Sequence, residues 1–198
     1  MSDLQKPDMV QLARQGMASS AVATMPTEKM SLLTTFATSY GMEAKAMLAT
    51  LQATIIPGGK ATPEQVASFV VVAHQYKLNP FTREIFAFPT KSGGIQPVVS
   101  VDGWAKIINE NPYSDGFTLT EIYDEKGNFS AVTCRMYRKD KAQPIEVTEY
   151  LRECARDTDP WRRWPMRMLR HKAFIQCARY AFGFSGIVDP DEAERNPD

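Results

Sequence analysis

The segment WRRWPMRMLRHKAFIQCARYAFGF, residues 161–184, combines strong positive charge with apolar surface. It holds six Lys or Arg residues and no Asp or Glu, whereas the chain of 198 residues has a formal net charge of zero. The stretch that follows, from Ile187 to Asp198, is acidic. Segregated positive charge is typical of a polyanion-binding surface, but a solvated helix face gives the same pattern.

A helix over residues 163–182 would carry two apolar faces separated by two basic strips. One apolar face comprises Met168, His171, Ile175, Ala178 and Phe182, and the other comprises Met166, Leu169, Ala173 and Tyr180. The strips comprise Arg163, Arg167 and Arg170 on one side and Lys172, Gln176 and Arg179 on the other. Burial in the helix's own domain needs only one apolar face.

We therefore expect the face with Leu169 to contact a second subunit and the basic strips to border a groove. On this interpretation Leu169→Asp leaves a folded protein that does not assemble, and Lys172→Ala or Arg179→Ala weakens DNA binding. A fully internal helix, whose long basic side chains reach outward to solvent, remains the alternative.

Arginine outnumbers lysine five to one in this segment. The planar guanidinium suits phosphate and also stacks on rings. Aromatic residues of the segment have the chemistry to stack on bases, among them Trp161, Trp164, Phe174 and Tyr180. Core packing is the more frequent use of such residues, and we retain only Trp161 as a stacking candidate.

The rest of the chain predicts an α+β fold, with helices on a small antiparallel sheet made of a hairpin and a three-stranded meander. Helical patterns cover residues 27–40, 42–55 and 62–76, with Thr62 as cap and Pro63 in the first turn. Residues 83–101 read as the hairpin, and Asp102 as the cap of a short helix ending near Pro112. Residues 115–151 read as the meander, with its end continuing as helix through Arg156.

The expected organisation has three parts. Residues 1–27 form a flexible arm, residues 28–188 form the core that binds DNA and oligomerises, and residues 189–198 form an acidic tail. A loop at 157–160 precedes the long helix.

Several function classes find little support in the sequence. The three cysteines, Cys134, Cys154 and Cys177, lack zinc spacing and indicate free thiols in a reducing cytoplasm. No secretory signal, membrane-length apolar run or Walker phosphate loop is present. A metal-dependent nuclease is an alternative, because acids occur in pairs at Asp124–Glu125 and Asp189–Asp191. Solvated loops explain both pairs equally well.

Five blocks of sequence carry a resemblance to a known family. They are NPFTREIFAFP, GIQPVVSVDGWAKIINEN, TCRMYRKD, PIEVTEYLRECAR and RMLRHKAFIQCARYAFGFSGI. In this order, and between Gln75 and Arg195, they resemble the RecT group of phage single-strand annealing proteins. The resemblance implies an ATP-independent recombinase that coats single-stranded DNA, pairs it with its complement, and holds the duplex on a ring or helical filament of head-to-tail subunits.

The resemblance also implies which residues line the DNA groove. The matching bases are Arg83, Lys91, Lys139, Arg167, Arg170, Lys172 and Arg179, with Lys106 as a weaker candidate. Gln176 lies on the same strip, and Trp161 completes the expected site. Met166 and Arg83 stand where a family member has lysine. A DNA-binding protein that does not anneal strands remains a second alternative.

The resemblance finally implies partners. No cofactor or structural metal is expected, and magnesium is expected at most as a counterion of DNA. Family members usually continue past the acidic stretch with a module that recruits a partner exonuclease and the host single-strand binding protein. We therefore expect this chain to be the annealing core alone or a naturally short member, working in the cytoplasm of a bacterial host.

Overall fold

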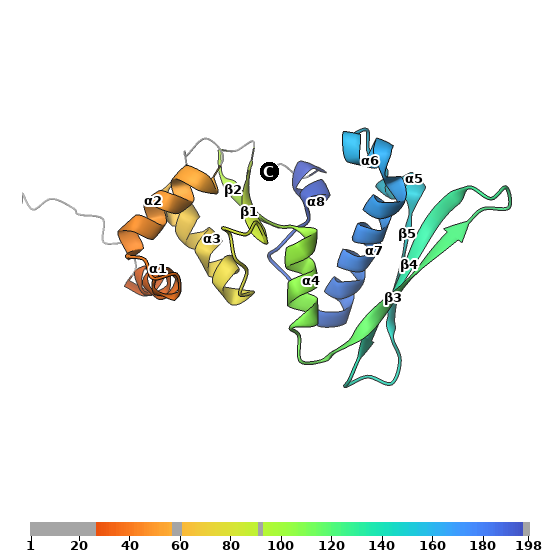
Figure 1. The fold of residues 1–198 in the computed structure, drawn as a ribbon, viewed down its shortest axis with the longest axis horizontal. Helices are drawn as coiled ribbons and strands as arrows, with labels where there is room; N and C mark the ends of the chain where they lie inside the picture. The colour runs from red at the N-terminus through yellow and green to blue at the C-terminus, as the bar shows by residue number, and fades with distance from the viewer. Residues whose placement is uncertain (1–26, 57–60, 91–92, 196–198) are drawn as a thin grey trace, which may run out of the picture.

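The computed structural model describes residues 27–56, 61–90 and 93–195. The molecule is elongated, with three N-terminal helices at one end and a three-stranded sheet at the other (Figure 1). The predicted arm at residues 1–27 lies outside the described residues, except for Thr27, which begins the first helix. None of the helices in the described part of the chain combines the length and apolar character needed to span a bilayer.

The N-terminal end is built from α1 (Thr27–Ser39), α2 (Ala44–Thr54) and α3 (Pro63–Gln75). The predicted cap of α3 is confirmed: the Thr62 hydroxyl accepts from Gln65 N, and the Gln65 side chain accepts from Thr62 N. This reciprocal pair satisfies two helix-end donors, and Pro63 occupies a position that needs none. Met47, Leu51 and Phe69 are buried between these helices.

The centre of the molecule holds a hairpin and a helix. The hairpin joins β1 (Ile85–Pro89) to β2 (Ile95–Val99) in antiparallel register, as predicted. Helix α4 (Val101–Asn109) follows, but its cap is Ser100, whose hydroxyl accepts from Gly103 N, and not Asp102. A Cβ at Gly103 would lie 2.2 Å from the Glu84 carbonyl oxygen, so glycine permits α4 to pack against the start of the hairpin.

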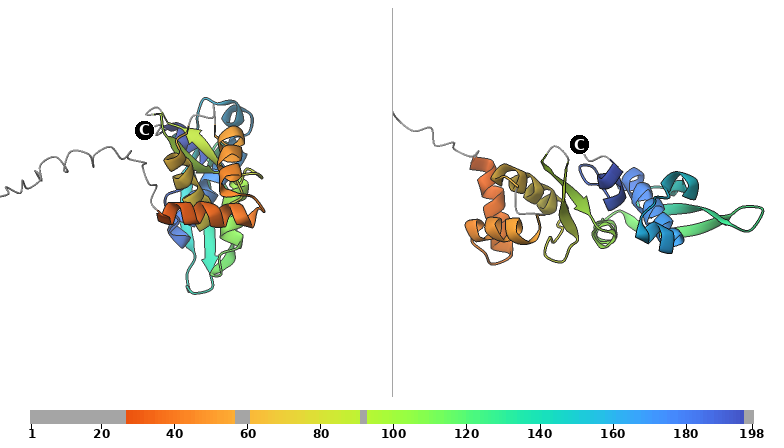
Figure 2. Two further views of the ribbon diagram at one scale, coloured as in Figure 1. Left: turned by 90° about the vertical axis from the view of Figure 1, so that its left-hand side faces the viewer. Right: turned by 90° about the horizontal axis from the view of Figure 1, so that it is seen from above.

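The far end is the meander β3 (Ser114–Tyr123), β4 (Phe129–Arg138) and β5 (Ile145–Tyr150), paired in the order β3-β4-β5. Two short helices, α5 (Leu151–Cys154) and α6 (Asp159–Arg163), lead into α7 (Pro165–Phe182). Gly183 ends α7 in the left-handed conformation at φ 70°, as its predicted stop. Helix α7 packs on one face of the sheet, and the other face is uncovered (Figures 1 and 2).

The α+β prediction is confirmed, with differences in detail. The hairpin and the meander form two separate sheets, which α4 and the C-terminal segment join. The helix expected to run through Arg156 ends at Cys154, and α6 begins inside the expected loop. After α7 the chain returns to the hairpin, where Val99 N donates to Val188 O at 2.9 Å.

The predicted acidic tail is also structured where it is described. Residues Pro190–Arg195 form α8, with Asp189 and Ala193 only 2% and 0% exposed. Among the acids of this segment, Asp189 is buried in the folded core and Asp191 and Glu192 are partly buried, whereas Glu194 is exposed.

Candidate nucleic-acid interface

Carboxylates of the C-terminal segment occupy the second basic strip of α7. Lys172 Nζ lies 2.6 Å from Asp189 Oδ2 and 4.0 Å from Glu192 Oε1, and the Lys172 side chain is 7% exposed. Gln176 Nε2 donates to Glu192 at 2.7 Å, and Arg179 donates to both oxygens of the same carboxylate at 3.0 and 2.5 Å. In the isolated subunit, the donors of Lys172, Gln176 and Arg179 therefore face the protein's own acids and not an open groove. That these residues bind DNA stays a prediction.

Trp161 is buried beside the same segment. Its ring is 3% exposed, and its Nε1 donates to Asp191 Oδ2 at 3.1 Å. Burial, followed by the neighbouring charge of Asp189, raises the pKa of Asp191 above its ordinary value. In the isolated subunit the Trp161 indole therefore fixes α8 against α6, and its stacking on a base stays a prediction.

Lys106 has a structural partner too. Its Nζ lies 2.8 Å from Glu84 Oε2 and donates to the Lys77 carbonyl at 2.9 Å. Burial raises the pKa of Glu84, but hydrogen bonds from Lys106 and from Asn79 N outweigh burial and leave that pKa below its ordinary value. Lys106 therefore ties α4 to the turn before β1 and is not a free cation.

Arg170 is half-exposed and paired. Its Nε donates to Glu121 Oε1 on β3 at 2.7 Å, and this bond is the main cause that lowers the pKa of Glu121. The Arg170 side chain is 43% exposed, so its ion pair with Glu121 is partly screened by solvent.

Three of the predicted bases are exposed and form no ion pair within the described residues: Arg83, Lys139 and Arg167. They come from three different places, the turn before β1, the turn after β4 and the first half of α7. Lys91 lies outside the described residues. Charges without carboxylate partners are those that a polyanion neutralises most effectively.

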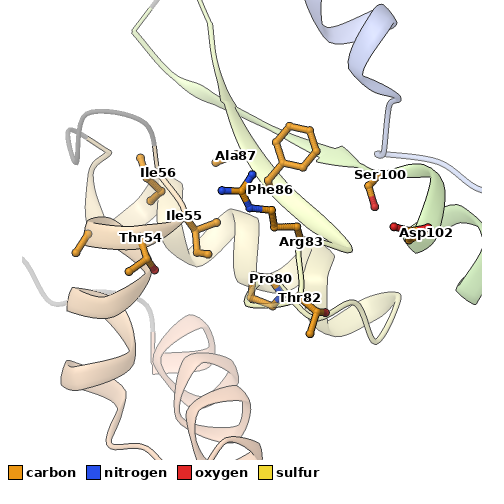
Figure 3. A pocket seen from close by; sticks show the side chains of 11 residues that line it. Thr54, Ile55, Ile56, Pro80, Thr82, Arg83, Phe86, Ala87, Ser100 and Asp102 are labelled. Carbon is orange, nitrogen blue, oxygen red and sulfur yellow. The ribbon is translucent and has the colours of Figure 1, made fainter. Parts of the chain in front are cut away.

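Arg83 lines an open pocket of about 600 Å³. Its walls come from the end of α2, the turn at 80–83, β1 and the start of α4. The guanidinium lies between Phe86 and Ile55, with Ser100 and Asp102 on the opposite side (Figure 3). The Arg83 backbone has φ 60°, a strained conformation for a side-chain-bearing residue, and Arg83 N donates to Pro80 O at 3.2 Å.

Arg167 lies at a second, more apolar pocket of about 320 Å³ between α4, β3 and α7. Phe117 and Phe174 form its aromatic wall, with ring centroids 4.8 Å apart, and Phe117 is 42% exposed. Arg170 and His171, which also lie on α7, line the pocket beside Arg167. Burial, and then the charge of Arg167, lowers the pKa of His171, so the imidazole is neutral at neutral pH.

The predicted subunit interface is divided by the fold. Leu169 and Ala173 are fully buried in the subunit's own core, so the expectation that they form an exposed apolar patch is wrong. Met166 is half-buried and Tyr180 is 73% exposed. Helix α7 has two apolar faces because it packs against β4 and β5 on one side and against α4 on another.

Three of the four acids considered as nuclease candidates, Asp124, Asp189 and Asp191, have other partners. Asp124 accepts from Lys126 N and Asn128 N in the tight turn between β3 and β4. Asp189 pairs with Lys172, and Asp191 accepts from Trp161. Within residues 27–56, 61–90 and 93–195, no three His, Cys, Asp or Glu side chains are grouped so that they could hold a metal ion.

Two exposed aromatic residues are not among the predicted site residues: Trp164, which was considered but not retained, and Phe117, which was not considered. Trp164 is 47% exposed, and the Arg167 guanidinium lies over its ring at 5.5 Å from the centroid. Phe117 opens the apolar pocket. Helical periodicity gave no means to prefer Trp164 over Trp161. Phe117 lies on β3, far from α7 in the sequence, so no local pattern could show that it contacts Phe174.

Two comparisons relate the chain to known proteins. The RecT family model matches residues 42–198. The chain is also 50% identical over 164 residues to the recombination protein bet of Escherichia phage lambda. That match covers 78% of this chain and 60% of the relative, so the chain spans less than two thirds of the relative's length.

Proposed function

Because the chain belongs to the RecT family, we propose that it is an ATP-independent single-strand annealing protein of phage-type recombination. It binds single-stranded DNA, pairs it with a complementary strand and holds the new duplex. The observation that carries the proposal is the family match over residues 42–198. Among the described residues of that stretch, Arg83, Lys139 and Arg167 are exposed and have no carboxylate partner.

Phosphate contacts by these bases supply the affinity. Such contacts are independent of sequence, which a protein that pairs any complementary strands requires. The strand pairing itself uses the hydrogen bonds of the bases, so the protein has to hold the strand by its backbone and leave base edges accessible. No cofactor is needed for this role, and magnesium acts as a counterion of DNA.

Assembly into a ring or helical filament is part of the proposal. The uncovered face of the meander supports it, because Ile122, Tyr137 and Tyr150 are all exposed there. A second copy of the chain would cover this face. The contact between subunits would then lie on the meander and not at Leu169, which is buried. Head-to-tail contacts then align the DNA-binding surfaces of neighbouring subunits.

The partners and the place of action follow from the family. A partner exonuclease and the host single-strand binding protein are expected to act through a C-terminal module, and the cytoplasm of the bacterial host is the expected compartment. The free thiols of Cys134, Cys154 and Cys177 suit a reducing compartment.

The test is an annealing assay with two complementary oligonucleotides, one labelled, without nucleotide. We expect annealing without ATP, an intact labelled strand with magnesium present, and clear loss of annealing in the variant Arg83→Ala/Lys139→Ala/Arg167→Ala. Lys126→Ala, at the exposed turn between β3 and β4, is the control for loss of a single charge far from the pockets. An absolute need for ATP, or cleavage of the strand, would refute the proposal. Tight binding without annealing would favour a plain binding protein.

A further inference from the structure

The bend between α6 and α7 presents an aromatic ring on a rigid backbone. Trp164 N donates to Pro160 O at 2.8 Å, and Trp164 O accepts from Met168 N at 3.0 Å. Pro165 follows, which keeps Trp164 out of the helical conformation, and its backbone has φ −136° and ψ 56°. Both ends of the residue are therefore fixed while the indole is 47% exposed.

The surroundings of this ring are basic. The Arg167 guanidinium lies over the indole and forms no ion pair within the described residues. Two nearby bases are already paired, Arg163 with Asp159 at 3.0 Å and Arg162 with Asp157 at 2.5 Å. Of these three arginines, Arg167 is thus the one that has no carboxylate partner within the described residues.

Arg167 also borders the apolar pocket that contains Phe117 and Phe174. The surface thus presents the exposed indole of Trp164, then the guanidinium of Arg167, and then the apolar pocket with the exposed ring of Phe117. A ligand that alternates flat rings with negative charges fits this arrangement. Single-stranded nucleic acid has this chemistry, and base stacking on aromatic side chains is sequence-tolerant.

From these contacts we infer that Trp164 is a stacking platform for a nucleobase of single-stranded DNA, and that Arg167 binds the phosphate beside that base. The inference rests on the proposed function and deepens it, because it assigns base contact to a residue distinct from the phosphate-binding bases. Tyr180 is more exposed, but no guanidinium lies over its ring among the described residues.

Tryptophan fluorescence provides a direct test. The chain has three tryptophans, of which Trp104 and Trp161 are 0% and 3% exposed. Titration with an oligothymidylate should quench the exposed, red-shifted part of the emission, while anisotropy of an end label reports binding in the same sample. Trp164→Phe should remove most of the quenching, because the two remaining indoles are buried.

A comparison of oligonucleotides isolates the stacking contribution. An oligonucleotide with abasic residues keeps every phosphate but removes the bases. We expect Trp164→Ala to weaken binding of the ordinary oligonucleotide about ten-fold, equivalent to about 1.4 kcal/mol, and to leave binding of the abasic one nearly unchanged. Tyr123→Ala, which removes a comparably exposed ring at the far end of the sheet, should change neither. Circular dichroism confirms that each variant is folded.

The outcomes separate the inference from the proposed function. Two results would overturn the stacking role and leave the proposed function intact. One is that the unmodified protein binds the oligonucleotide without quenching of its fluorescence. The other is that Trp164→Ala loses the same affinity for the ordinary and the abasic oligonucleotide. Absence of single-strand binding by the unmodified protein would overturn both. Loss of quenching in Trp164→Phe together with the selective loss in Trp164→Ala supports the stacking role.

Discussion

Lys172 has the positive charge that a phosphate contact needs, but in the structure it forms a buried ion pair with Asp189. Its ammonium is buried against Asp189, and neighbouring Glu192 binds Gln176 and Arg179. Removal of one partner from such a pair leaves the other charge buried and uncompensated. The sequence shows the basic strip and the acidic stretch separately, but no local pattern states that α8 folds back onto α7.

Lys172→Ala should therefore lower the free energy of unfolding by roughly 3–5 kcal/mol. Urea unfolding monitored by circular dichroism measures this loss. The double variant Lys172→Met/Asp189→Leu should recover part of the loss, because it removes both charges together. A stable, fully folded Lys172→Ala protein with weakened DNA binding would instead restore Lys172 to the DNA site.

His171 makes the stability of the protein depend on pH. Burial and then Arg167 lower its pKa, while Asp102 and Asp191 act weakly in the opposite direction. The unfolded chain therefore takes up the proton first as pH falls below about 6.5. Stability should be unaffected by His171 above that pH and should decrease between the unfolded and the folded pKa. A plot of the free energy of unfolding against pH should be flatter across this range in His171→Asn than in the unmodified protein. An equal slope in both proteins would contradict this role of His171.

At the scale of the element, α7 separates what local sequence predicts from what it does not. Its end at Gly183 and the cap of α3 by Thr62 were predictable, because caps and stops act within one helical turn. Two apolar faces were also correctly recognised. Their partners were not, since periodicity reports that a face is covered but not whether the same chain or a second one covers it.

Two matched substitutions test where assembly takes place. Leu169→Asp should unfold the subunit, because an unpaired carboxylate would be buried at a fully enclosed site. Ile122→Asp, on the uncovered face of the meander, should leave the subunit folded but prevent rings or filaments from forming. Circular dichroism and size-exclusion chromatography, with electron microscopy of DNA complexes, distinguish these results. A folded and assembling Ile122→Asp protein would move the interface to another surface, with Tyr180 as the next candidate.

At the scale of the whole molecule, the fold sorts the bases into two classes. Lys106, Lys172 and Arg179 hold elements together, whereas Arg83, Lys139 and Arg167 remain exposed and unpaired within the described residues. The α+β class and most element positions followed from hydrophobic patterns and turn residues. The division of the bases did not, because it depends on ion pairs between distant segments such as Arg170 with Glu121.

The salt dependence of single-strand binding tests this division most directly. The logarithm of the affinity should fall linearly with the logarithm of salt concentration, by about 0.7 for each phosphate contact on single strands. Arg167→Ala should reduce that slope by about 0.7, whereas Arg179→Gln, measured under conditions where it is folded, should leave the slope unchanged. An unchanged slope in Arg167→Ala together with a reduced slope in Arg179→Gln would contradict the account and return the DNA to the strip that α8 now covers.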